Sequence, residues 1–220
     1  MPSSRIHVYF MPGLAASSKI FEFIELPSET FEIHYLEWFL PDRGMSFEAY
    51  ARKMVEQIEH KQSVLIGVSF GGMLVQEMAK YMSTRKIIII SSIKQKSEMP
   101  KRLLFAKYTK VHRLLPTGLV NNVELLAKYA FGETVTKRLS LYEQYLALRD
   151  KYYLDWSIDK IVHWEQNTYH PDLVHIHGDR DAVFPVAPIS NYIPVKGGTH
   201  TMILHRFKWF NERLPTIILE

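Results

Sequence analysis

Short apolar runs alternate with amphipathic stretches over the first ninety residues. Runs of β-branched and aromatic residues that end at glycine, proline or a polar residue are typical of buried strands. Such runs cover residues 6–11, 31–36, 63–68 and 85–90. The clearest amphipathic stretch is residues 47–58, where Ser46 is placed to cap a helix. Strands and helices alternating at this spacing predict βαβ units, and therefore a parallel sheet with helices on both faces.

The alternation stops after residue 90, and the pattern then has only helical periods until the chain nears residue 170. These helical patterns run over residues 104–115, 123–130, 139–146 and 158–164. The sheet resumes at residues 173–177, adds a short strand near residues 190–194, and precedes an amphipathic C-terminal helix through Met202 and Phe210. We therefore expect an α/β fold with a mostly or all parallel sheet of about six strands. It forms one domain over residues 1–220, with a helical cap insert at residues 91–165.

Composition narrows the possible chemistry. An apolar share of 47% with 23% charged residues is that of a soluble globular protein. The chain has no cysteine, which excludes disulfides, thiolate metal sites and a cysteine nucleophile. The apolar run before Pro12 is too short for a signal sequence or a membrane span, so a cytoplasmic protein is expected.

The net charge of +4 is unevenly distributed. Seven basic residues fall in one segment against the single acid Glu98: Lys94, Lys96, Lys101, Arg102, Lys107, Lys110 and Arg113. A basic segment can bind nucleic acid, but no recognised binding motif accompanies this one. A solvated helix face is the favoured interpretation, and no nucleic-acid partner is expected.

The most informative motif is a Gly-x-Ser-x-Gly at residues 67–71, placed between an apolar run and a helical pattern. A serine at such a strand–helix turn points its hydroxyl off the end of the sheet, and Gly67 and Gly71 leave room for the bend. Backbone N–H groups at the start of the helix then face whatever Ser69 attacks. The alternative is a tight turn without chemistry.

A serine hydroxyl needs a general base, and the base needs a third group that fixes its orientation. The C-terminal part of the chain offers both. Asp179 and Asp181 follow the strand at residues 173–177, and His200 lies in a glycine-rich turn before the last helix. In a parallel sheet these strand ends lie at the edge where Ser69 emerges, so either aspartate could orient His200.

Three motifs in this order resemble those of the α/β-hydrolase superfamily, and the resemblance covers nearly the whole chain apart from the helical insert. They are the elbow Gly67-Val68-Ser69-Phe70-Gly71, the acid loop His177-Gly178-Asp179-Arg180-Asp181 and the turn Gly198-Thr199-His200. Pro12-Gly13-Leu14 stands where many members have His-Gly-x. The resemblance also implies that the two antiparallel leading strands of larger members are absent here.

The resemblance implies a role for each site residue. Ser69 would be the nucleophile, Asp181 the acid and His200 the base, with Leu14 and Phe70 giving the oxyanion N–H groups. The expected function is that of a serine hydrolase that cleaves a small carboxylic ester or thioester through an acyl-enzyme, without a cofactor or metal. Amide hydrolysis, C–C cleavage and perhydrolysis use the same triad, and a non-catalytic binding protein on this fold is a further alternative.

The helical insert is expected to select the substrate. It leaves the sheet at the edge where Ser69 emerges, so it can form a lid over the site. Its apolar and aromatic residues could wall an acyl pocket, including Leu104, Tyr108, Tyr145 and Trp156.

A metal-dependent hydrolase is the rival mechanism. His175, His177 and Asp179 match a His-x-His-x-Asp pattern, and the two histidines alternate onto one face of a strand. Against this reading, Arg180 stands where that pattern has a further histidine, and too little chain follows to complete such a fold. The other histidines, such as His7, His34 and His163, show no ligand spacing, and there is no phosphate-binding or dinucleotide-binding motif.

Overall fold

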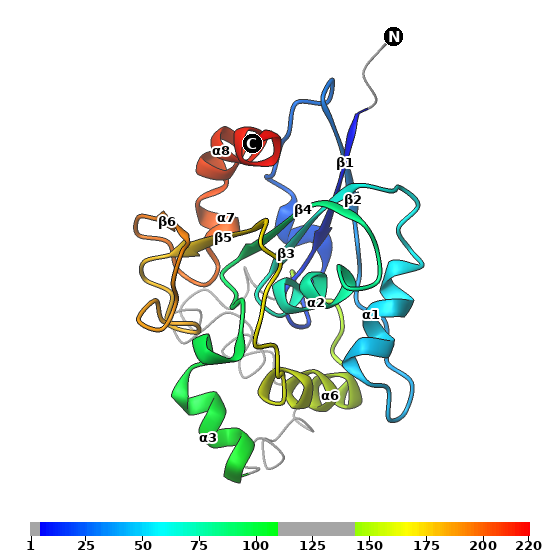
Figure 1. Cartoon of the computed structure of the whole chain (residues 1–220), viewed down its shortest axis with the longest axis vertical. Helices are drawn as coiled ribbons and strands as arrows, with labels where there is room; N and C mark the ends of the chain where they lie inside the picture. The colour runs from blue at the N-terminus through cyan, green and yellow to red at the C-terminus, as the bar shows by residue number, and fades with distance from the viewer. Residues whose placement is uncertain (1–4, 110–143) are drawn as a thin grey trace.

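The computed structural model describes residues 5–109 and 144–220 (Figure 1). Its strands form one sheet of six strands in the order β2-β1-β3-β4-β5-β6, and every neighbouring pair is parallel. The strands are β1 (Ile6–Met11), β2 (Phe31–Tyr35), β3 (Ser63–Val68), β4 (Thr84–Ile90), β5 (Leu173–Gly178) and β6 (Ile193–Val195). The predicted parallel sheet of about six strands is confirmed.

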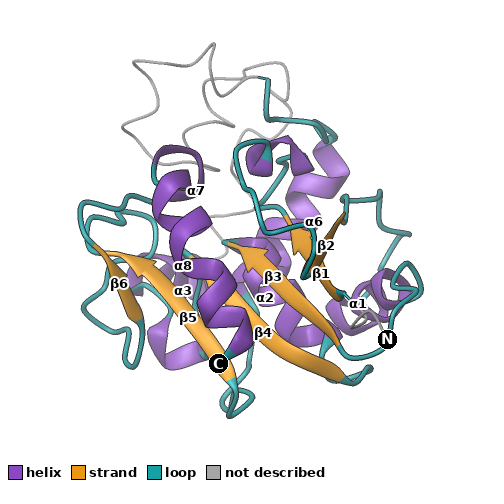
Figure 2. Cartoon of the chain, turned by 90° about the horizontal axis from the view of Figure 1, so that it is seen from above, coloured by secondary structure: helices purple, strands orange, loops and turns teal. Residues whose placement is uncertain are grey.

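Helices cover both faces of this sheet. They are η1 (Ser18–Phe21), α1 (Phe47–Val55), α2 (Phe70–Met78), η2 (Lys96–Glu98), α3 (Lys101–Thr109), α6 (Lys151–Val162), α7 (Met202–His205) and α8 (Phe207–Leu219). Figure 2 shows α7 and α8 on one side of the sheet and α1 and α2 on the other. The predicted cap of α1 is present, because the Ala49 N–H donates to Ser46 Oγ at 3.1 Å.

The core lies at the two central strands. All residues of β3 are buried, and the four consecutive isoleucines that end β4 are almost completely buried. A continuous apolar run is needed here because helices cover both faces of the strands. Each buried aliphatic side chain contributes roughly 1.5–3 kcal/mol. The carboxyl ends of β3 and β4 are therefore held in place by the core, and so are the starts of the loops that follow them.

The helical insert is described only in part. Its described elements are η2, α3 and α6, and the ring of Trp156 on α6 packs against Tyr50 of α1 with 4.7 Å between ring centroids. The helical patterns predicted between residues 110 and 143, together with Lys110 and Arg113, lie outside the described residues, as do the side chains of Lys107 and Tyr108.

The C-terminal helix differs from its prediction. One continuous helix was expected, but the chain forms α7 and α8, with a break at Arg206. Arg206 has φ −114° and ψ 20°, outside the α-helical range, and its guanidinium donates to the carbonyl of Gly197 at 3.3 Å. None of the helices in the described parts of the chain combines the length and the hydrophobicity that crossing a membrane requires.

The basic segment is not one solvated face, so that prediction is wrong for Lys94. The Lys94 side chain is 1% exposed, lies 3.5 Å from the Glu98 carboxylate, and donates to the carbonyls of Ser190 and Asn191. A buried ammonium needs such partners, since its desolvation is otherwise very unfavourable. Arg102 likewise donates to backbone carbonyls, those of Ala182 and Val183.

Candidate active site

Ser69 lies at the bend between β3 and α2, in a backbone conformation that non-glycine residues seldom adopt. Its φ is +53° and its ψ is −119°. Neighbouring groups hold this conformation: the Ser69 N–H donates to Ile90 O at 2.9 Å, and the Ser92 hydroxyl donates to Ser69 O at 2.7 Å. The end of β4 therefore fixes the serine at the carboxyl edge of the sheet.

The two glycines of the motif are required by close backbone contacts. A Cβ on Gly67 would lie 2.3 Å from the carbonyl oxygen of Gly71. A Cβ on Gly71 would lie 2.3 Å from the carbonyl oxygen of Pro12 in the loop that follows β1. The Gly-x-Ser-x-Gly pattern thus allows the bend to close and to pack against the loop that carries Leu14.

Ser69, His200 and Asp181 are joined by hydrogen bonds, although they come from three distant parts of the sequence. His200 Nε2 lies 2.9 Å from Ser69 Oγ, and His200 Nδ1 lies 2.9 Å from Asp181 Oδ2. All three residues are buried, with Ser69 9% exposed. Because an ionised carboxylate only accepts hydrogen bonds, Nδ1 carries the proton, and the lone pair of Nε2 faces the serine hydroxyl.

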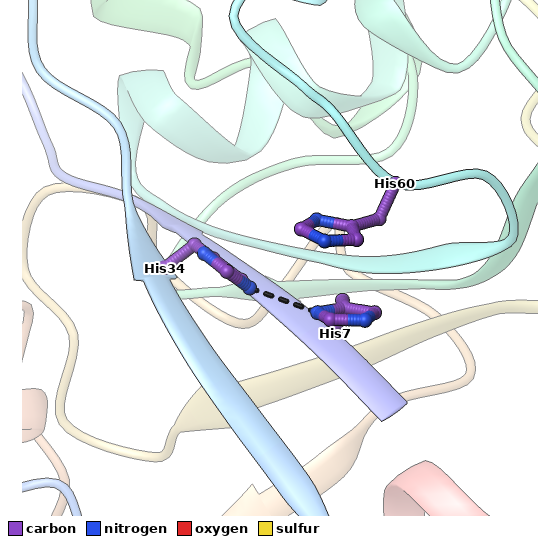
Figure 3. Close-up of side chains that lie close together, drawn as sticks. All are labelled: His7, His34 and His60. Atoms are coloured by element: carbon purple, nitrogen blue, oxygen red, sulfur yellow. Dashed lines mark hydrogen bonds between the residues drawn. The ribbon is translucent and has the colours of Figure 1, made fainter. Parts of the chain in front are cut away.

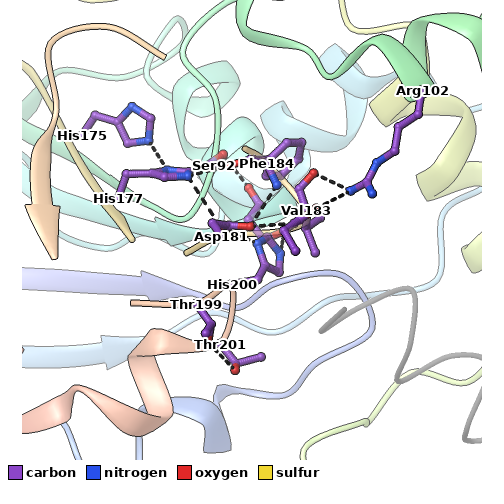
Figure 4. Close-up of polar contacts among 12 residues, drawn as sticks. Ser92, Arg102, His175, His177, Asp181, Val183, Phe184, Thr199, His200 and Thr201 are labelled. Carbon is purple, nitrogen blue, oxygen red and sulfur yellow. Dashed lines mark hydrogen bonds and ion pairs between the residues drawn. The ribbon is translucent and has the colours of Figure 1, made fainter. Parts of the chain in front are cut away.

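Asp181 is held as a carboxylate. Its Oδ1 accepts the N–H groups of Val183 at 2.8 Å and Phe184 at 2.9 Å, while Oδ2 faces His200 (Figure 4). Burial alone would raise the pKa of Asp181, but the charge of His200 and the hydrogen bonds from its ring and from the Phe184 N–H lower it overall. The carboxylate is therefore ionised at neutral pH and can stabilise an imidazolium.

Asp179, the other candidate acid, does not reach His200. Its Oδ1 accepts the N–H of Gly197 at 2.7 Å, and its side chain is exposed to solvent. This contact ties the acid loop to the turn that carries His200. The structure thus gives the contact with the imidazole to Asp181 and a turn contact to Asp179.

Two further histidines, His175 and His177, lie next to Asp181, with His177 Nε2 3.6 Å from Asp181 Oδ2. His177 Nε2 donates to Phe184 O at 2.8 Å, and His175 Nε2 donates to His177 Nδ1 at 2.9 Å (Figure 4). Burial lowers the pKa of both rings, and it lowers that of His175 to about 2 with help from His177 and Lys94. His175 Nε2 and both nitrogens of His177 are engaged with each other and with a carbonyl instead of converging with Asp179, so the ligand set of the rival metal mechanism is not assembled.

The loop at residues 13–16 carries Leu14 and is fixed by two aromatic residues that sequence reasoning missed. Trp38 Nε1 donates to Gly13 O at 2.8 Å. The Tyr153 hydroxyl accepts the N–H of Ala15 at 3.3 Å from within the core. Tyr and Trp are suited to this role because an apolar ring carries a polar tip, but no local motif marks them in the sequence.

Two backbone N–H groups are candidates for binding an oxyanion. Phe70 is the first residue of α2, so its N–H has no acceptor within the helix. Leu14 follows Gly13, whose Cβ position would lie 3.5 Å from Ser69 Cβ, so the loop passes close to the serine. Within the described residues neither N–H donates a hydrogen bond to the protein. Both can therefore serve a negative oxygen beside Ser69.

A small and mostly apolar pocket opens beside Ser69. Its lining residues are Gly13, Leu14, Ala16, Ile20, Val68, Ser69, His200, Thr201, Ile203 and Leu204. Two insert residues expected in its wall lie elsewhere: Trp156 donates its Nε1–H to Met45 O at 2.7 Å, and the Tyr145 hydroxyl donates to Glu22 at 2.6 Å. Among the described residues the sheet loops and α7, more than the insert, shape the space next to the serine.

No protein-family model and no curated protein sequence matches the chain. Several solved structures are similar to it over nearly their whole length. A bromoperoxidase from Bacillus anthracis is 18% identical, with 99% of this chain and 93% of that chain covered and a TM-score of 0.67. A thermophilic esterase from Thermogutta terrifontis is 14% identical, with coverage of 96% and 90% and a TM-score of 0.66. A hydrolase from Pseudomonas aeruginosa PA01 is 12% identical, with coverage of 98% and 91% and a TM-score of 0.68. At these identities the likeness shows a shared fold.

Proposed function

Because the chain has the α/β-hydrolase fold and joins Ser69, His200 and Asp181 by hydrogen bonds, we propose that it is a serine hydrolase of carboxylic esters or thioesters. The observation that carries the proposal is this hydrogen-bonded chain, with both contacts at 2.9 Å. A protein that only bound a ligand would have no need of a base on the serine and a buried carboxylate on the base.

In the proposed reaction His200 Nε2 takes the proton of the Ser69 hydroxyl while Oγ attacks the substrate carbonyl. The N–H groups of Leu14 and Phe70 donate to the oxyanion of the tetrahedral intermediate. The imidazolium then gives its proton to the leaving oxygen or sulfur, which leaves an acyl group on Ser69. Water attacks the acyl-enzyme by the same steps, and Asp181 stabilises the imidazolium each time.

The pocket beside Ser69 favours an apolar acyl group of modest size. Ile20, Ile203 and Leu204 give it aliphatic walls, and each substrate CH₂ buried there contributes about 0.8 kcal/mol, or roughly fourfold in binding. Amide hydrolysis, C–C cleavage and perhydrolysis use the same triad and are the alternative reactions.

The proposal is tested with p-nitrophenyl esters and acyl thioesters of graded acyl length, assayed on the wild-type protein and on Ser69→Ala. We expect turnover in the wild type and its loss in Ser69→Ala. Ser190→Ala, at an exposed serine away from the bend, is the matched control and should keep wild-type turnover. Wild-type protein that binds these esters without turning any over contradicts the proposal and favours the binding protein.

A further inference from the structure

Three histidines meet near the other end of the sheet from Ser69. His7 lies on β1, His34 on β2, and His60 in the segment that leads into β3 (Figure 3). One ring nitrogen from each lies within 4.8 Å of the other two. His7 Nδ1 and His34 Nε2 are 3.0 Å apart, and the rings of His7 and His60 stack with 3.4 Å between centroids.

The sheet register explains why these residues meet. β1 pairs with β2 so that His7 lies opposite Glu32 and Tyr9 lies opposite His34. Alternate residues of a strand share a face, so all four side chains project from the same face of the sheet. His60 approaches this face after the chain leaves α1.

The surroundings of His7 and His34 favour the neutral form of these two rings. Burial and the neighbouring imidazoles lower the pKa of His7 and of His34, against a smaller opposing effect of Glu32. Glu32 is also paired with Arg5 at 2.7 Å, and it lies 3.8 Å from His7 Nδ1 and 4.0 Å from His34 Nε2. Neutral imidazole is the form that binds metal ions, and a carboxylate stands beside two of the three rings.

A hydrogen bond also orients the third ring. His60 Nδ1 lies 2.7 Å from the Tyr9 hydroxyl, whose oxygen accepts the N–H of Glu59 at 3.3 Å. Histidine ligands of metals commonly have their second nitrogen held by such a partner, which fixes the tautomer and the ring direction. With Nδ1 engaged, the nitrogen left for a ligand on His60 is Nε2.

We propose that His7, His34 and His60 bind a divalent transition-metal ion such as Zn²⁺, with Glu32 or water as the fourth ligand. Three imidazoles and an oxygen are a donor set that zinc accepts. Metal–nitrogen bonds of about 2.0–2.1 Å in tetrahedral geometry place ligand nitrogens roughly 3.4 Å apart. The rings of His7 and His60 are only 11° from parallel, so metal binding requires these side chains to turn until their nitrogens point at one ion.

The metal would fasten β1, β2 and the segment before β3 to one another. Its position separates it from the proposed chemistry, because Met11 pairs with Gly67 and His7 lies four residues earlier on β1. That is about 13 Å along the strand at 3.3 Å per residue. The site is therefore independent of the proposed hydrolase function, and its measurable effect is on metal affinity and thermal stability.

The test uses untagged protein that has been stripped with a chelator and dialysed. Calorimetric titration with ZnCl₂ should show one ion bound per chain, and Zn²⁺ at a hundred times its Kd should raise Tm by about 5–10 °C. His34→Gln and His60→Gln should weaken binding at least a hundredfold. Tyr9→Phe keeps all three imidazoles and should weaken it about tenfold.

His170→Gln is the matched control, because His170 is an exposed histidine far along the chain from the cluster, and it should bind Zn²⁺ as the wild type does. Absence of binding and of a Tm rise in the wild type overturns the proposal. So does undiminished binding in folded His34→Gln and His60→Gln. If those variants fail to fold, the test rests on Zn²⁺ binding by Tyr9→Phe and on the visible absorption spectrum of the Co²⁺-loaded wild type. The proposal is also overturned if Tyr9→Phe binds Zn²⁺ as tightly as the wild type and the Co²⁺ spectrum is not that of a four-coordinate ion.

Discussion

Replacing Asp181 by asparagine should reverse the tautomer of His200. Two backbone N–H groups, those of Val183 and Phe184, point at Asp181 Oδ1. In Asp181→Asn they hold the amide oxygen at that position, so the NH₂ group takes the place of Oδ2 and faces His200 Nδ1. His200 must then carry its proton on Nε2, where it cannot accept the proton of Ser69.

The structure also sets the size of the loss. Turning the amide over restores the useful tautomer but leaves the N–H groups of Val183 and Phe184 facing NH₂ without an acceptor. Each lost hydrogen bond costs about 1–3 kcal/mol. Turnover through that minor orientation is therefore reduced by roughly 30-fold to 10⁴-fold, at 1.36 kcal/mol per tenfold. The upper end agrees with the loss of about 10⁴-fold known for such a replacement in a serine protease.

The assay is kcat on p-nitrophenyl acetate, with thermal unfolding to show that each variant is folded. Asp179→Asn is the matched control, since its amide oxygen can still accept the N–H of Gly197, and its kcat should stay within about threefold of wild type. The ¹⁵N shifts of His200 should report a proton on Nδ1 in the wild type and on Nε2 in Asp181→Asn. A folded Asp181→Asn within tenfold of wild type, or an equal loss in Asp179→Asn, refutes the reasoning.

Three further outcomes are expected. Burial, aided by His177 and Lys94, lowers the pKa of His175 from 6.5 to about 2, so the unfolded chain takes up this proton first as the pH falls. The wild type should thus lose about 2 kcal/mol of stability through this group between pH 7 and pH 5, and urea unfolding should show that His175→Gln loses correspondingly less. Ile203→Ala enlarges the pocket beside Ser69, and the preferred acyl chain in the ester panel should lengthen, with about fourfold gained per added CH₂. Tyr153→Phe leaves the buried Ala15 N–H without its acceptor, so kcat should fall roughly tenfold with little change in KM; an unchanged kcat would show that the hydroxyl does not hold the loop.

The strands could be predicted from the sequence because each is a compact apolar run bounded by turn residues. The continuous isoleucine run at residues 87–90 is typical of a strand buried on both faces, as the central strands of a parallel sheet are. Ser69 could be located because Gly67 and Gly71 flank it at two positions where close backbone contacts leave no room for a side chain. Sequence reasoning from the residues left Asp179 and Asp181 equivalent, since which carboxylate reaches His200 depends on the path of the loop.

Other features could not be predicted because they depend on distant parts of the chain. Lys94 can be buried because carbonyls almost a hundred residues away accept hydrogen bonds from its ammonium group. Tyr153 holds the loop at Ala15 across a separation of 138 residues. His7 and His34 become neighbours through the register of β1 with β2, which the sequence pattern leaves open.

The central claim is that His200 and Asp181 activate Ser69, and covalent labelling tests it most directly. Wild-type protein treated with a fluorophosphonate and digested for mass spectrometry should carry one label per chain, on the peptide that contains Ser69. His200→Ala should label far more slowly, and Ser69→Ala should not label at all. Label on another residue, or stoichiometric labelling that persists in Ser69→Ala, would contradict the account.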